Sequence, residues 1–389
     1  MRVLVNAVSA RTGGSFAYLA NFLPTLSEMG LADEFFVFVP AGRAAAFRNL
    51  SPNIHIETEA LAEQGESSRF FFDQWTLRGF ARQHRVGCIL STANFGMLWP
   101  PAPQVISVRN AAYFSRAYHR HVRKVKGRLA VARVAAQRRM VALSCSSSAV
   151  VVTPTEAMRD MLIEWGAAKP GKCMVINHGF DREYFLSMND TEGRLEDTLA
   201  RREDEKLLFY PSLYGKHKNF DTLVEAVSHL VRRGRNVRLI LTCTISPSVD
   251  RYQRRTNELI EKLKMRGHIS QYGPVPYQYM PRIYRGCDVV VWPSLAASFG
   301  LPLLEAMASR RPIVASGIAA NNEVAGNAAV YFDTFEPGDL ADKVEQALRG
   351  EVRERLVAAG EKRVADFSWR RHVEEFIKVF ARLAGKKNG

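Results

Sequence analysis

The amino-acid sequence predicts an α/β protein with two doubly wound domains, each a parallel sheet covered by helices. Three observations support this prediction. The chain has 389 residues, which exceeds what one hydrophobic core usually organises. Short apolar runs rich in β-branched residues alternate with amphipathic segments of helical length. This alternation occurs twice, on either side of a charged, strand-poor stretch at residues 187–206.

The first half opens with a strand at residues 3–5, which leads to a turn at Gly13 and Gly14 and a helix expected at residues 16–29. Residues 1–186 are therefore predicted to form an N-terminal domain, and residues 187–206 a linker. Further strands of the N-terminal domain are expected at residues 35–39, 88–90, 104–108 and 149–153.

The second half repeats this rhythm, so residues 207–366 are predicted to form a C-terminal domain, and residues 367–389 a last helix. Doubly wound sheets bind ligands at the carboxyl ends of their strands, and two such domains facing each other would form one cleft for two substrates. Strands are expected at residues 207–210, 237–241, 288–292 and 312–315, and helices at residues 220–233 and 252–266.

The charge of the chain limits its partners. A formal net charge of +15 and a pI near 9.8 favour polyanionic partners, namely nucleoside diphosphates, anionic lipid or nucleic acid. Nucleic acid is not expected, because the sequence has no zinc-finger spacing, RNA-binding aromatic motif or helix-turn-helix pattern. The chain enters a strand directly after Met1 and has no long uncharged apolar run, which predicts a cytoplasmic protein.

Positive charge is densest between Arg116 and Arg139, among alanines and valines. A basic amphipathic helix of this kind suits a membrane surface with acidic headgroups, here the inner face of the plasma membrane. The alternative is a solvated helix face. The basic residues of this stretch are Arg116, Arg120, Arg123, Lys124, Lys126, Arg128, Arg133, Arg138 and Arg139.

The cysteines and acidic residues indicate no cofactor. The five cysteines are widely spaced, without a Cys-x-x-Cys pair or a histidine at zinc-ligand spacing, and are expected to be reduced and mostly buried. The chain also lacks an Asp-x-Asp triplet of the kind that holds a divalent cation on a diphosphate. Neither a metal nor a cofactor is therefore expected.

The segment at residues 292–308 carries the most chemistry. A strand ends at its start, and a helix is expected to begin with Pro302 in its first turn. The free amides of Gly300 and Leu301 would then offer a site for a phosphate or for sugar hydroxyls. Glu305, expected in the first helical turn, would accept hydrogen bonds from ribose hydroxyls. Alternatively, Glu305 only complements the helix dipole and Gly300 only permits a turn.

This segment resembles the C-terminal signature of the retaining family 4 glycosyltransferases, which have the GT-B fold. The signature is commonly written Pro-Ser, then Glu-x-Phe-Gly-Leu-Pro-x-x-Glu-Ala-Met-Ala, and residues 293–308 follow it in register. The resemblance covers nearly the whole chain, closely after Leu207 and loosely before it. It implies two Rossmann-like domains facing across a cleft, with the last helix packed back on the N-terminal domain.

The resemblance also implies a donor site in the C-terminal domain. Lys218 matches the family's lysine that meets the donor diphosphate, where positive charge would stabilise the leaving group. The family's usual arginine is not evident near Ser212, so Lys216 substitutes for it or the loop carries less charge. The implied donor-binding residues are Ser212, Lys216, Lys218, Ser298, Phe299, Gly300, Leu301 and Glu305.

On the acceptor side, Gly13 and Gly14 occupy the place of the family's glycine-rich loop, although a double glycine equally suits a tight turn. Arg109 and Asn110 stand where many relatives have a histidine near the reacting carbon. Their side chains would bind sugar hydroxyls or an acceptor phosphate, or serve a surface role instead.

One position departs from the family pattern, which has two glutamates separated by seven residues. Glu305 is the second, and Ala297 stands in the place of the first, which contacts the transferred sugar in relatives. The catalytic positions are therefore Lys218, Ala297 and Glu305, and the alanine puts sugar orientation and turnover in doubt. The chain is a variant that positions its sugar otherwise, an inactive homologue or a deliberate substitution.

The resemblance thus implies a retaining, metal-independent transferase for a hexosyl or deoxyhexosyl group. Its donor would be a nucleoside diphosphate sugar, and its acceptor a glycan or lipid-linked molecule in bacterial surface polysaccharide synthesis. A sugar-nucleotide epimerase shares the fold and the cleft but not the Phe-Gly-Leu-Pro signature. A non-catalytic nucleotide-sugar or glycan-binding homologue is favoured only by Ala297.

Overall fold

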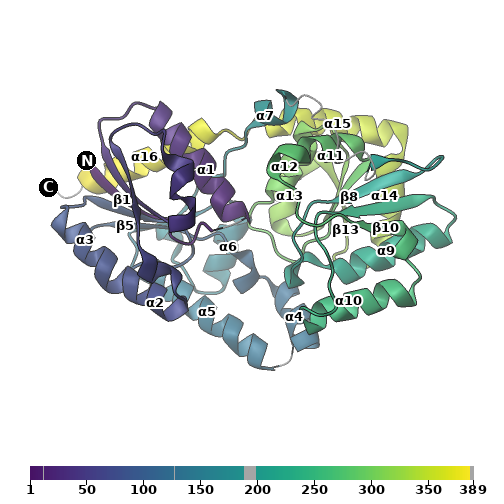
Figure 1. Cartoon of the computed structure of the whole chain (residues 1–389), viewed down its shortest axis with the longest axis horizontal. Helices are drawn as coiled ribbons and strands as arrows, with labels where there is room; N and C mark the ends of the chain where they lie inside the picture. The colour runs from purple at the N-terminus through teal and green to yellow at the C-terminus, as the bar shows by residue number, and fades with distance from the viewer. Residues whose placement is uncertain (12, 127, 188–198, 386–389) are drawn as a thin grey trace. The chain divides into compact units, whose positions relative to one another are not determined.

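The computed structural model describes residues 1–11, 13–126, 128–187 and 199–385, and the chain divides into two compact units (Figure 1). Unit 1 comprises residues 1–114, 132–179 and 367–389, and unit 2 comprises residues 115–131 and 180–366. Each unit is built around a parallel sheet with helices packed on it, which confirms the predicted fold class.

The sheet of unit 1 runs in the order β3-β2-β1-β4-β5-β6-β7, and every described pair of neighbours is parallel. The strand order reverses between β1 and β4, so the carboxyl ends of these strands form the switch point at which such sheets bind ligands. The strands are β1 (Arg2–Asn6), β2 (Glu34–Val39), β3 (Ile54–Thr58), β4 (Cys88–Ser91), β5 (Gln104–Ser107), β6 (Val150–Thr153) and β7 (Cys173–Val175).

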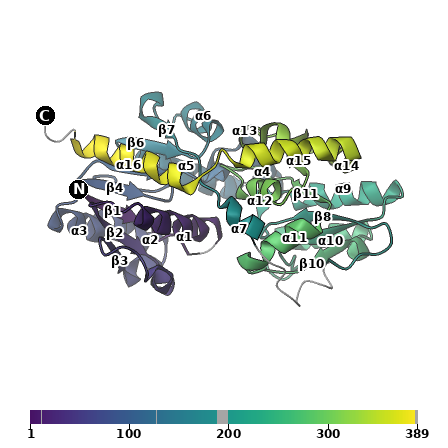
Figure 2. The same ribbon diagram turned by 90° about the horizontal axis from the view of Figure 1, so that it is seen from above.

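Helices cover the sheet of unit 1, and the last one returns from the end of the chain to pack on the first (Figure 2). The rings of Phe22 and Phe376 lie 5.8 Å apart in this contact. A Cβ on Gly179 would lie 2.3 Å from the backbone nitrogen of Trp369, so only glycine permits this approach. The predicted return of the last helix is confirmed. These helices are α1 (Gly13–Glu28), α2 (Glu66–Phe71), α3 (Leu77–Gln83), α5 (Arg128–Ser146), α6 (Glu156–Glu164) and α16 (Trp369–Gly385).

Unit 2 has a second parallel sheet, in the order β10-β9-β8-β11-β12-β13, with its switch point between β8 and β11. Its strands are β8 (Lys206–Tyr210), β9 (Val237–Leu241), β10 (Ile269–Gln271), β11 (Val289–Trp292), β12 (Ile313–Ser316) and β13 (Ala329–Phe332). Its helices are α4 (Arg116–Lys126), α7 (Arg182–Ser187), α9 (Phe220–Arg232), α10 (Arg251–Lys262), α11 (Met280–Gly286), α12 (Leu301–Ala308), α13 (Ala319–Ala325), α14 (Pro337–Leu348) and α15 (Gly350–Val364).

The basic stretch from Arg116 to Arg139 comprises α4 and most of α5, which lie on either side of residue 127, and the boundary between the units falls within it, at residues 131 and 132. In α4, the ring of His121 lies 5.3 Å from that of Tyr252, and the Arg120 guanidinium lies 5.8 Å from the ring of Phe335. Part of the expected membrane-facing helix therefore packs on unit 2. The side chains of Lys124, Lys126 and Arg128 lie outside the described residues.

The observed division differs from the predicted domains in two segments, since residues 115–131 and 180–186 belong to unit 2. Residues 188–198 of the predicted linker lie outside the described part of the chain. Its last residues pack on unit 2, where Arg201 forms an ion pair with Asp288 at 2.8 Å. In the described ranges, no helix combines the length and the hydropathy needed to cross a bilayer. The five cysteines are free thiols, and all but Cys173 are buried, as expected.

Candidate functional site

The loop after β8 places a lysine beside an indole ring. It contains a 3-10 turn, η6 (Lys216–Lys218). The ammonium nitrogen of Lys218 lies 4.5 Å from the ring centre of Trp292, the last residue of β11. Burial lowers the pKa of Lys218 to about 8. At neutral pH this side chain is therefore still mainly protonated, and it forms no ion pair with any residue that the structure describes.

Asn219 explains why the chain turns directly after this lysine. Its backbone is left-handed, with φ 57° and ψ 41°, a conformation that asparagine tolerates better than most residues. Its side-chain amide donates to the carbonyl of Thr334 at 2.7 Å, and its side-chain oxygen accepts from the Thr222 hydroxyl at 2.9 Å. Asn219 therefore acts as a structural residue that fixes the end of η6 and the start of α9.

Hydrogen bonds join the loops that follow β8, β11 and β12. The carbonyl of His217 accepts from the Leu295 amide at 2.8 Å and from the Ser294 hydroxyl at 3.1 Å. The Ser316 hydroxyl donates to the Ser294 carbonyl at 2.6 Å, and the Asn321 amide donates to the Ser316 hydroxyl at 3.0 Å. The three loops are thus fixed to one another at the carboxyl edge of the sheet.

The start of α12 borders the same indole as Lys218. Gly300 precedes the helix with φ +90°, a conformation that favours glycine. A Cβ built there would lie 3.1 Å from a side-chain carbon of Leu303 and 3.7 Å from Nε1 of Trp292. Pro302 occupies the first turn, as expected, and among the described residues no side chain caps the helix. The first amides of α12 and the Lys218 ammonium are therefore close to one ring.

Glu305 is held by two tyrosines. Its Oε2 accepts from the Tyr284 hydroxyl at 2.6 Å, and its Oε1 accepts from the Tyr277 hydroxyl at 3.3 Å. Burial raises the pKa of Glu305 to about 7, so both charge states are populated near neutrality. The expected position in the first turn is wrong: because α12 begins at Leu301, Glu305 lies in the second turn. The helix dipole acts mainly on the first turn, so it explains this carboxylate poorly.

The other residues implied for donor binding lie in the same loops of unit 2. Ala297 and Ser298 are half-buried ahead of α12, and Phe299 is buried. Ser212 is buried, and its hydroxyl donates to the carbonyl of the next residue at 2.9 Å. Lys216 is half-buried at the start of η6. Their contacts with a donor stay predictions.

A segment from the first half of the chain contributes to this edge of unit 2. The Ser115 hydroxyl, ahead of α4, donates to the carbonyl of Leu295 at 2.7 Å. The ring of Tyr118 packs edge-on against His217 at 6.2 Å. Burial lowers the pKa of His217 to about 3, so its imidazole is neutral. No sequence pattern indicated this contact, because Ser115 belongs to no recognisable motif.

Arg109 and Asn110 are engaged within unit 1. The Arg109 guanidinium donates to the carbonyl of Thr92 at 2.5 Å and lies 4.2 Å from the ring centre of Tyr18. Asn94 accepts from the backbone amides of Arg109 and Asn110 at 2.8 and 2.9 Å. The Asn110 side chain caps a 3-10 turn by accepting from the amide two residues on, at 3.1 Å. Their contacts with a sugar or an acceptor stay predictions.

The switch point of unit 1 carries polar groups that the sequence did not indicate. The Asn6 amide at the end of β1 donates to Asp73 at 2.8 Å, and Asp73 forms an ion pair with Arg69 at 3.2 Å. Nearby in sequence, Gly13 begins α1 with φ +60°, which favours glycine. A Cβ on Gly13 or Gly14 would meet no described atom within 4 Å, so both glycines border open space.

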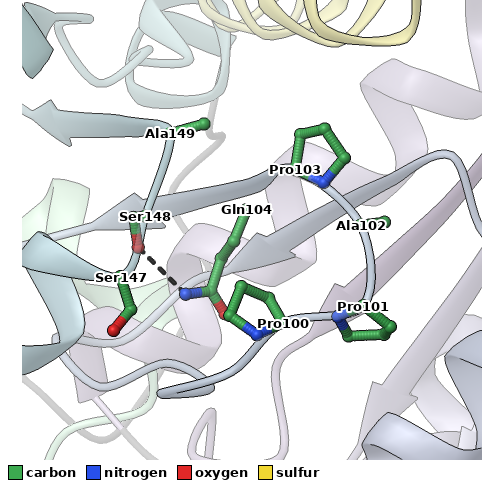
Figure 3. Close-up of a pocket in the computed structure, with 8 residues that line it drawn as sticks. All are labelled: Pro100, Pro101, Ala102, Pro103, Gln104, Ser147, Ser148 and Ala149. Atoms are coloured by element: carbon green, nitrogen blue, oxygen red, sulfur yellow. Dashed lines mark hydrogen bonds between the residues drawn. The ribbon is translucent and has the colours of Figure 1, made fainter. Parts of the chain in front are cut away.

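A cavity of about 370 Å³ lies at the opposite edge of the unit 1 sheet, where β5 and β6 begin (Figure 3). The amide group of Gln104 is already bonded there, to the Ser148 hydroxyl at 2.9 Å and to the Met97 carbonyl at 3.1 Å. None of the predicted site residues lines this cavity. Its lining consists of Pro100, Pro101, Ala102, Pro103, Gln104, Ser147, Ser148 and Ala149.

The chemistry of the unit 2 edge suits an anionic ligand that carries hydroxyl groups. Lys218 and the backbone amide of Leu301 at the start of α12 favour negative charge, and the Glu305 oxygens retain lone pairs for hydroxyl donors beside those that the tyrosines use. Within the described residues, no three His, Cys, Asp or Glu side chains are grouped so that they could hold a metal ion.

Comparison with known proteins assigns this half of the chain to a family. Residues 193–363 match the family model described as glycosyl transferases group 1. Unit 2 carries a glycosyl transferases group 1 domain. The resemblance that residues 293–308 suggested is therefore confirmed at the level of this family, and Lys218, Trp292 and Glu305 all lie inside the matched range of the group 1 domain.

Curated relatives of the group 1 domain are named as glycosyltransferases. D-inositol 3-phosphate glycosyltransferase of Saccharomonospora viridis is 30% identical over 239 residues, which cover 59% of this chain and 54% of that protein. O-antigen chain mannosyltransferase B of Escherichia coli is 31% identical over 127 residues, 32% of this chain and 33% of that protein. The chain thus spans about half the length, or less, of the curated relatives that it matches.

Solved structures show that both units together have the GT-B fold. Sucrose-phosphate synthase of Thermosynechococcus elongatus aligns with a TM-score of 0.76 at 16% identity, over 99% of this chain and 100% of that one. HepE of Anabaena, in complex with UDP and glucose, aligns with a TM-score of 0.71 at 15% identity, over 98% of this chain and 100% of that one. At these identities the likeness establishes the fold alone.

Proposed function

We propose that this protein is a retaining glycosyltransferase that moves a hexosyl or deoxyhexosyl group from a nucleoside diphosphate sugar to a glycan or lipid-linked acceptor. The family of the group 1 domain and the names of its relatives support the class of reaction. The presence of UDP and glucose in the HepE complex supports the class of donor.

The observation that carries the proposal is the position of Lys218. A half-buried cation without a carboxylate partner among the described residues is costly in free energy, unless an anion arrives to pair with it. Gly300, directly before α12, borders the same indole, and the Leu301 amide that begins the helix favours the same charge. A donor diphosphate would supply that anion, and Lys218 would stabilise the charge that develops on the leaving phosphate.

In the proposed reaction, the acceptor oxygen bonds to the anomeric carbon on the face from which the diphosphate leaves. The departing phosphate oxygen takes the acceptor proton, so neither a protein nucleophile nor a metal ion is assigned a step. Glu305 holds the ribose hydroxyls, and the backbone at residues 299–301 holds the sugar. Gly13, Gly14, Arg109 and Asn110 are proposed for the acceptor side.

The cellular setting is also proposed. The O-antigen mannosyltransferase relative of Escherichia coli and the fold neighbour WaaG, a glycosyltransferase involved in lipopolysaccharide biosynthesis, support a role in bacterial surface polysaccharide synthesis. Such a role suits a cytoplasmic enzyme on the inner face of the plasma membrane. The charge of +15 is consistent with anionic lipid as a neighbour.

Nucleotide binding tests the site. Calorimetric titration with UDP, GDP and ADP first identifies the base. The variant Lys218→Met should then bind that nucleotide at least about tenfold more weakly, since charge-assisted hydrogen bonds contribute roughly 1.5–3 kcal/mol. Lys262→Met, which removes an exposed lysine from α10 of the same unit, is the matched control and should bind normally. Equal affinity in both variants would refute the assigned site.

Ala297 favours a second candidate, a non-catalytic nucleotide-sugar or glycan-binding protein, because a methyl group replaces the carboxylate that contacts the sugar in relatives. Incubation of the donor with and without candidate acceptors separates the alternatives. A transferase consumes donor only with an acceptor, and an epimerase converts the donor alone. A protein that binds donor tightly but transfers sugar to no acceptor would support the second candidate.

A further inference from the structure

Unit 1 exposes large aromatic side chains on one helical segment, residues 66–83. The segment consists of α2, a π-helical turn η3 (Phe72–Thr76) and α3. The exposed fractions are 38% for Phe70, 49% for Phe71 and 57% for Trp75. The rings of Phe71 and Trp75 are stacked, with their centres 5.0 Å apart. We call Phe70, Phe71, Trp75 and the neighbouring Trp99 the aromatic ridge.

The opposite face of this segment already satisfies the core of unit 1. Phe72, Leu77 and Ala81 are buried in one hydrophobic cluster with the sheet, and the ring of Phe72 lies 5.6 Å from that of Phe38. An amphipathic helix that buries one face normally carries polar residues on the other. The aromatic ridge therefore needs an explanation other than the core.

Trp99 is tied to the same segment by a buried glutamine. Gln74, in the π-helical turn, accepts from the Leu98 amide at 2.8 Å and donates to the Gly96 carbonyl at 3.4 Å. The loop that carries Trp99 is thus fixed against the helix, and 63% of the Trp99 side chain is exposed. Trp99 therefore lies on a loop that is hydrogen-bonded to the helical segment carrying Phe70, Phe71 and Trp75.

Arginines continue the exposed face beyond the aromatic rings. Arg78 and Arg82 lie four residues apart in α3, directly after the turn that carries Trp75, and this spacing places them on one side of that helix. Neither forms an ion pair with a described residue, and Arg82 is exposed. By contrast, Asp73 is buried and paired with Arg69, so it does not offset their charge at the surface.

We propose that the aromatic ridge inserts into the headgroup region of an anionic lipid bilayer, with Arg78 and Arg82 against the lipid phosphates. Tryptophan and phenylalanine beside arginine are the side chains that favour this interface, because the rings replace water with acyl carbon while the cations stay among headgroups. The net charge of +15 attracts the whole chain to such a surface. This surface differs from the basic stretch at residues 116–139 and does not depend on glycosyl transfer.

Vesicle binding tests the proposal. The full-length chain is floated with vesicles of phosphatidylcholine alone and with vesicles that contain about a third phosphatidylglycerol. The wild-type chain should bind the anionic vesicles. The double variant Phe71→Ser/Trp75→Ser should bind them roughly 100-fold more weakly, since each buried aromatic ring contributes at least a tenfold gain in partitioning. Val249→Ser, which removes an exposed apolar side chain from unit 2, is the matched apolar control and should bind normally.

Charge is tested separately. Arg78→Gln/Arg82→Gln should weaken binding to anionic vesicles by about 30-fold, following about 1 kcal/mol for each basic residue near an anionic surface. Arg353→Gln/Arg355→Gln removes the same charge from the exposed face of α15 in unit 2 and should have little effect. Equal losses in both pairs would show attraction by net charge alone and would overturn the proposal.

Brominated lipids report insertion directly. Vesicles with bromine on the acyl chains should quench the fluorescence of the wild-type chain and quench Trp75→Phe/Trp99→Phe much less. The other tryptophans, Trp165, Trp292 and Trp369, lie outside the aromatic ridge. Three outcomes would overturn the proposal. The wild-type chain does not bind the vesicles, Phe71→Ser/Trp75→Ser binds them as tightly as the wild-type chain, or the wild-type chain is a dimer that this double variant dissociates.

Discussion

Units 1 and 2 share a parallel sheet with one reversal of strand order, but the charged groups at their switch points are in opposite states. In unit 1, Arg109 donates to the carbonyl of Thr92 and stacks on Tyr18, and Arg69 is paired with Asp73. In unit 2, Lys218 has an indole beside it and no ion-pair partner in the described residues. The same topology therefore holds one edge whose cations are hydrogen-bonded within their unit and one edge whose lysine contacts only an aromatic ring in the bonds described.

This difference suggests that conserved topology alone does not identify a binding edge. In both units, polar residues that follow the strands indicate a site. The two units differ in the partners of those residues. A cation with a full set of internal partners stabilises its own loop, whereas an unpaired cation lowers stability and favours ligand binding. Variants of the two edges should consequently change different properties of the protein.

The largest effect is expected from Ala297→Glu, which supplies the carboxylate that the family pattern implies at this position, against the transferred sugar in the proposed function. Turnover should rise by about 10- to 1000-fold, because a sugar held at its reacting position gains rate more than affinity. Affinity for the bare nucleotide should stay within roughly threefold. The check is a paired measurement of turnover, with a competent donor and acceptor, and of nucleotide affinity. Vigorous activity with Ala297 that falls when glutamate is introduced would contradict this account of the loop.

The next effect is on folding, where Arg109→Met and Lys218→Met should differ in sign. Arg109→Met should lower the free energy of unfolding by about 2 kcal/mol, because a charged hydrogen bond and a cation–π contact are lost. Lys218→Met should leave it unchanged or raise it, because a half-buried cation is replaced by an apolar chain. Chemical denaturation without nucleotide measures both. Two variants with equal destabilisation would remove the proposed difference between the edges.

A smaller effect is expected from the charge of Glu305. Ribose hydroxyls bond best to the ionised carboxylate, and burial raises the pKa of Glu305 to about 7. Affinity for a sugar nucleotide, whose diphosphate does not titrate near neutrality, should therefore fall by up to about tenfold from pH 8 to pH 6. Glu305→Gln should bind more weakly at pH 8, and its affinity should rise about twofold from pH 8 to pH 6, because Lys218, whose pKa is about 8, becomes fully protonated. A steep profile that persists in Glu305→Gln would assign the titration to another group.

The smallest effect concerns the response of stability to pH, which should differ in sign between the units. In unit 1, burial lowers the pKa of His372 to about 3 and lowers that of His178 as well. The contribution of these two histidines to the free energy of unfolding is present above the ordinary histidine pKa near 6.5 and is lost as the pH falls below it. In unit 2, the raised pKa of Glu305 gives a contribution to the free energy of unfolding that is present below about pH 4.5 and is lost as the pH rises through about 7.

Calorimetry between pH 8 and pH 5 separates these contributions. His372→Gln should reduce the loss of stability on acidification by about 1 kcal/mol per pH unit below pH 6.5. Glu305→Gln should gain stability relative to the wild-type chain at pH 8 and little at pH 5. Parallel pH profiles in all three proteins would show that neither buried group governs the response.

The sequence predicted the central strands of both sheets and missed four others for one physical reason. β3, β7, β10 and β13 are the edge strands of their sheets. An edge strand is covered less completely, so its residues include half-exposed polar ones, as in the pattern of β3 and β10. A continuous apolar run marks only a strand that is buried on both faces.

The candidate site was predicted where a motif carries the chemistry and missed where distant contacts do. Residues 293–308 indicated the start of α12 and Gly300 because a glycine and a proline have local conformational preferences. The two tyrosines on Glu305 and the link from Ser115 to Leu295 depend on tertiary packing. No local pattern encodes that packing, so the second-turn position of Glu305 and the place of α4 were found only in the structure.

The hydrogen bond from Ser115 to Leu295 bears on how this chain could be recombined with its relatives. A chimera that exchanges everything before residue 180 would give unit 2 a foreign residue 115 and a foreign α4. The carbonyl of Leu295 could then lose its donor, next to the loop that carries Ala297. Chimeras should therefore keep residues 115–131 with unit 2 and transplant α16 with the rest of unit 1. The functional modules of this protein are interleaved along its gene, and a single crossover cannot exchange them.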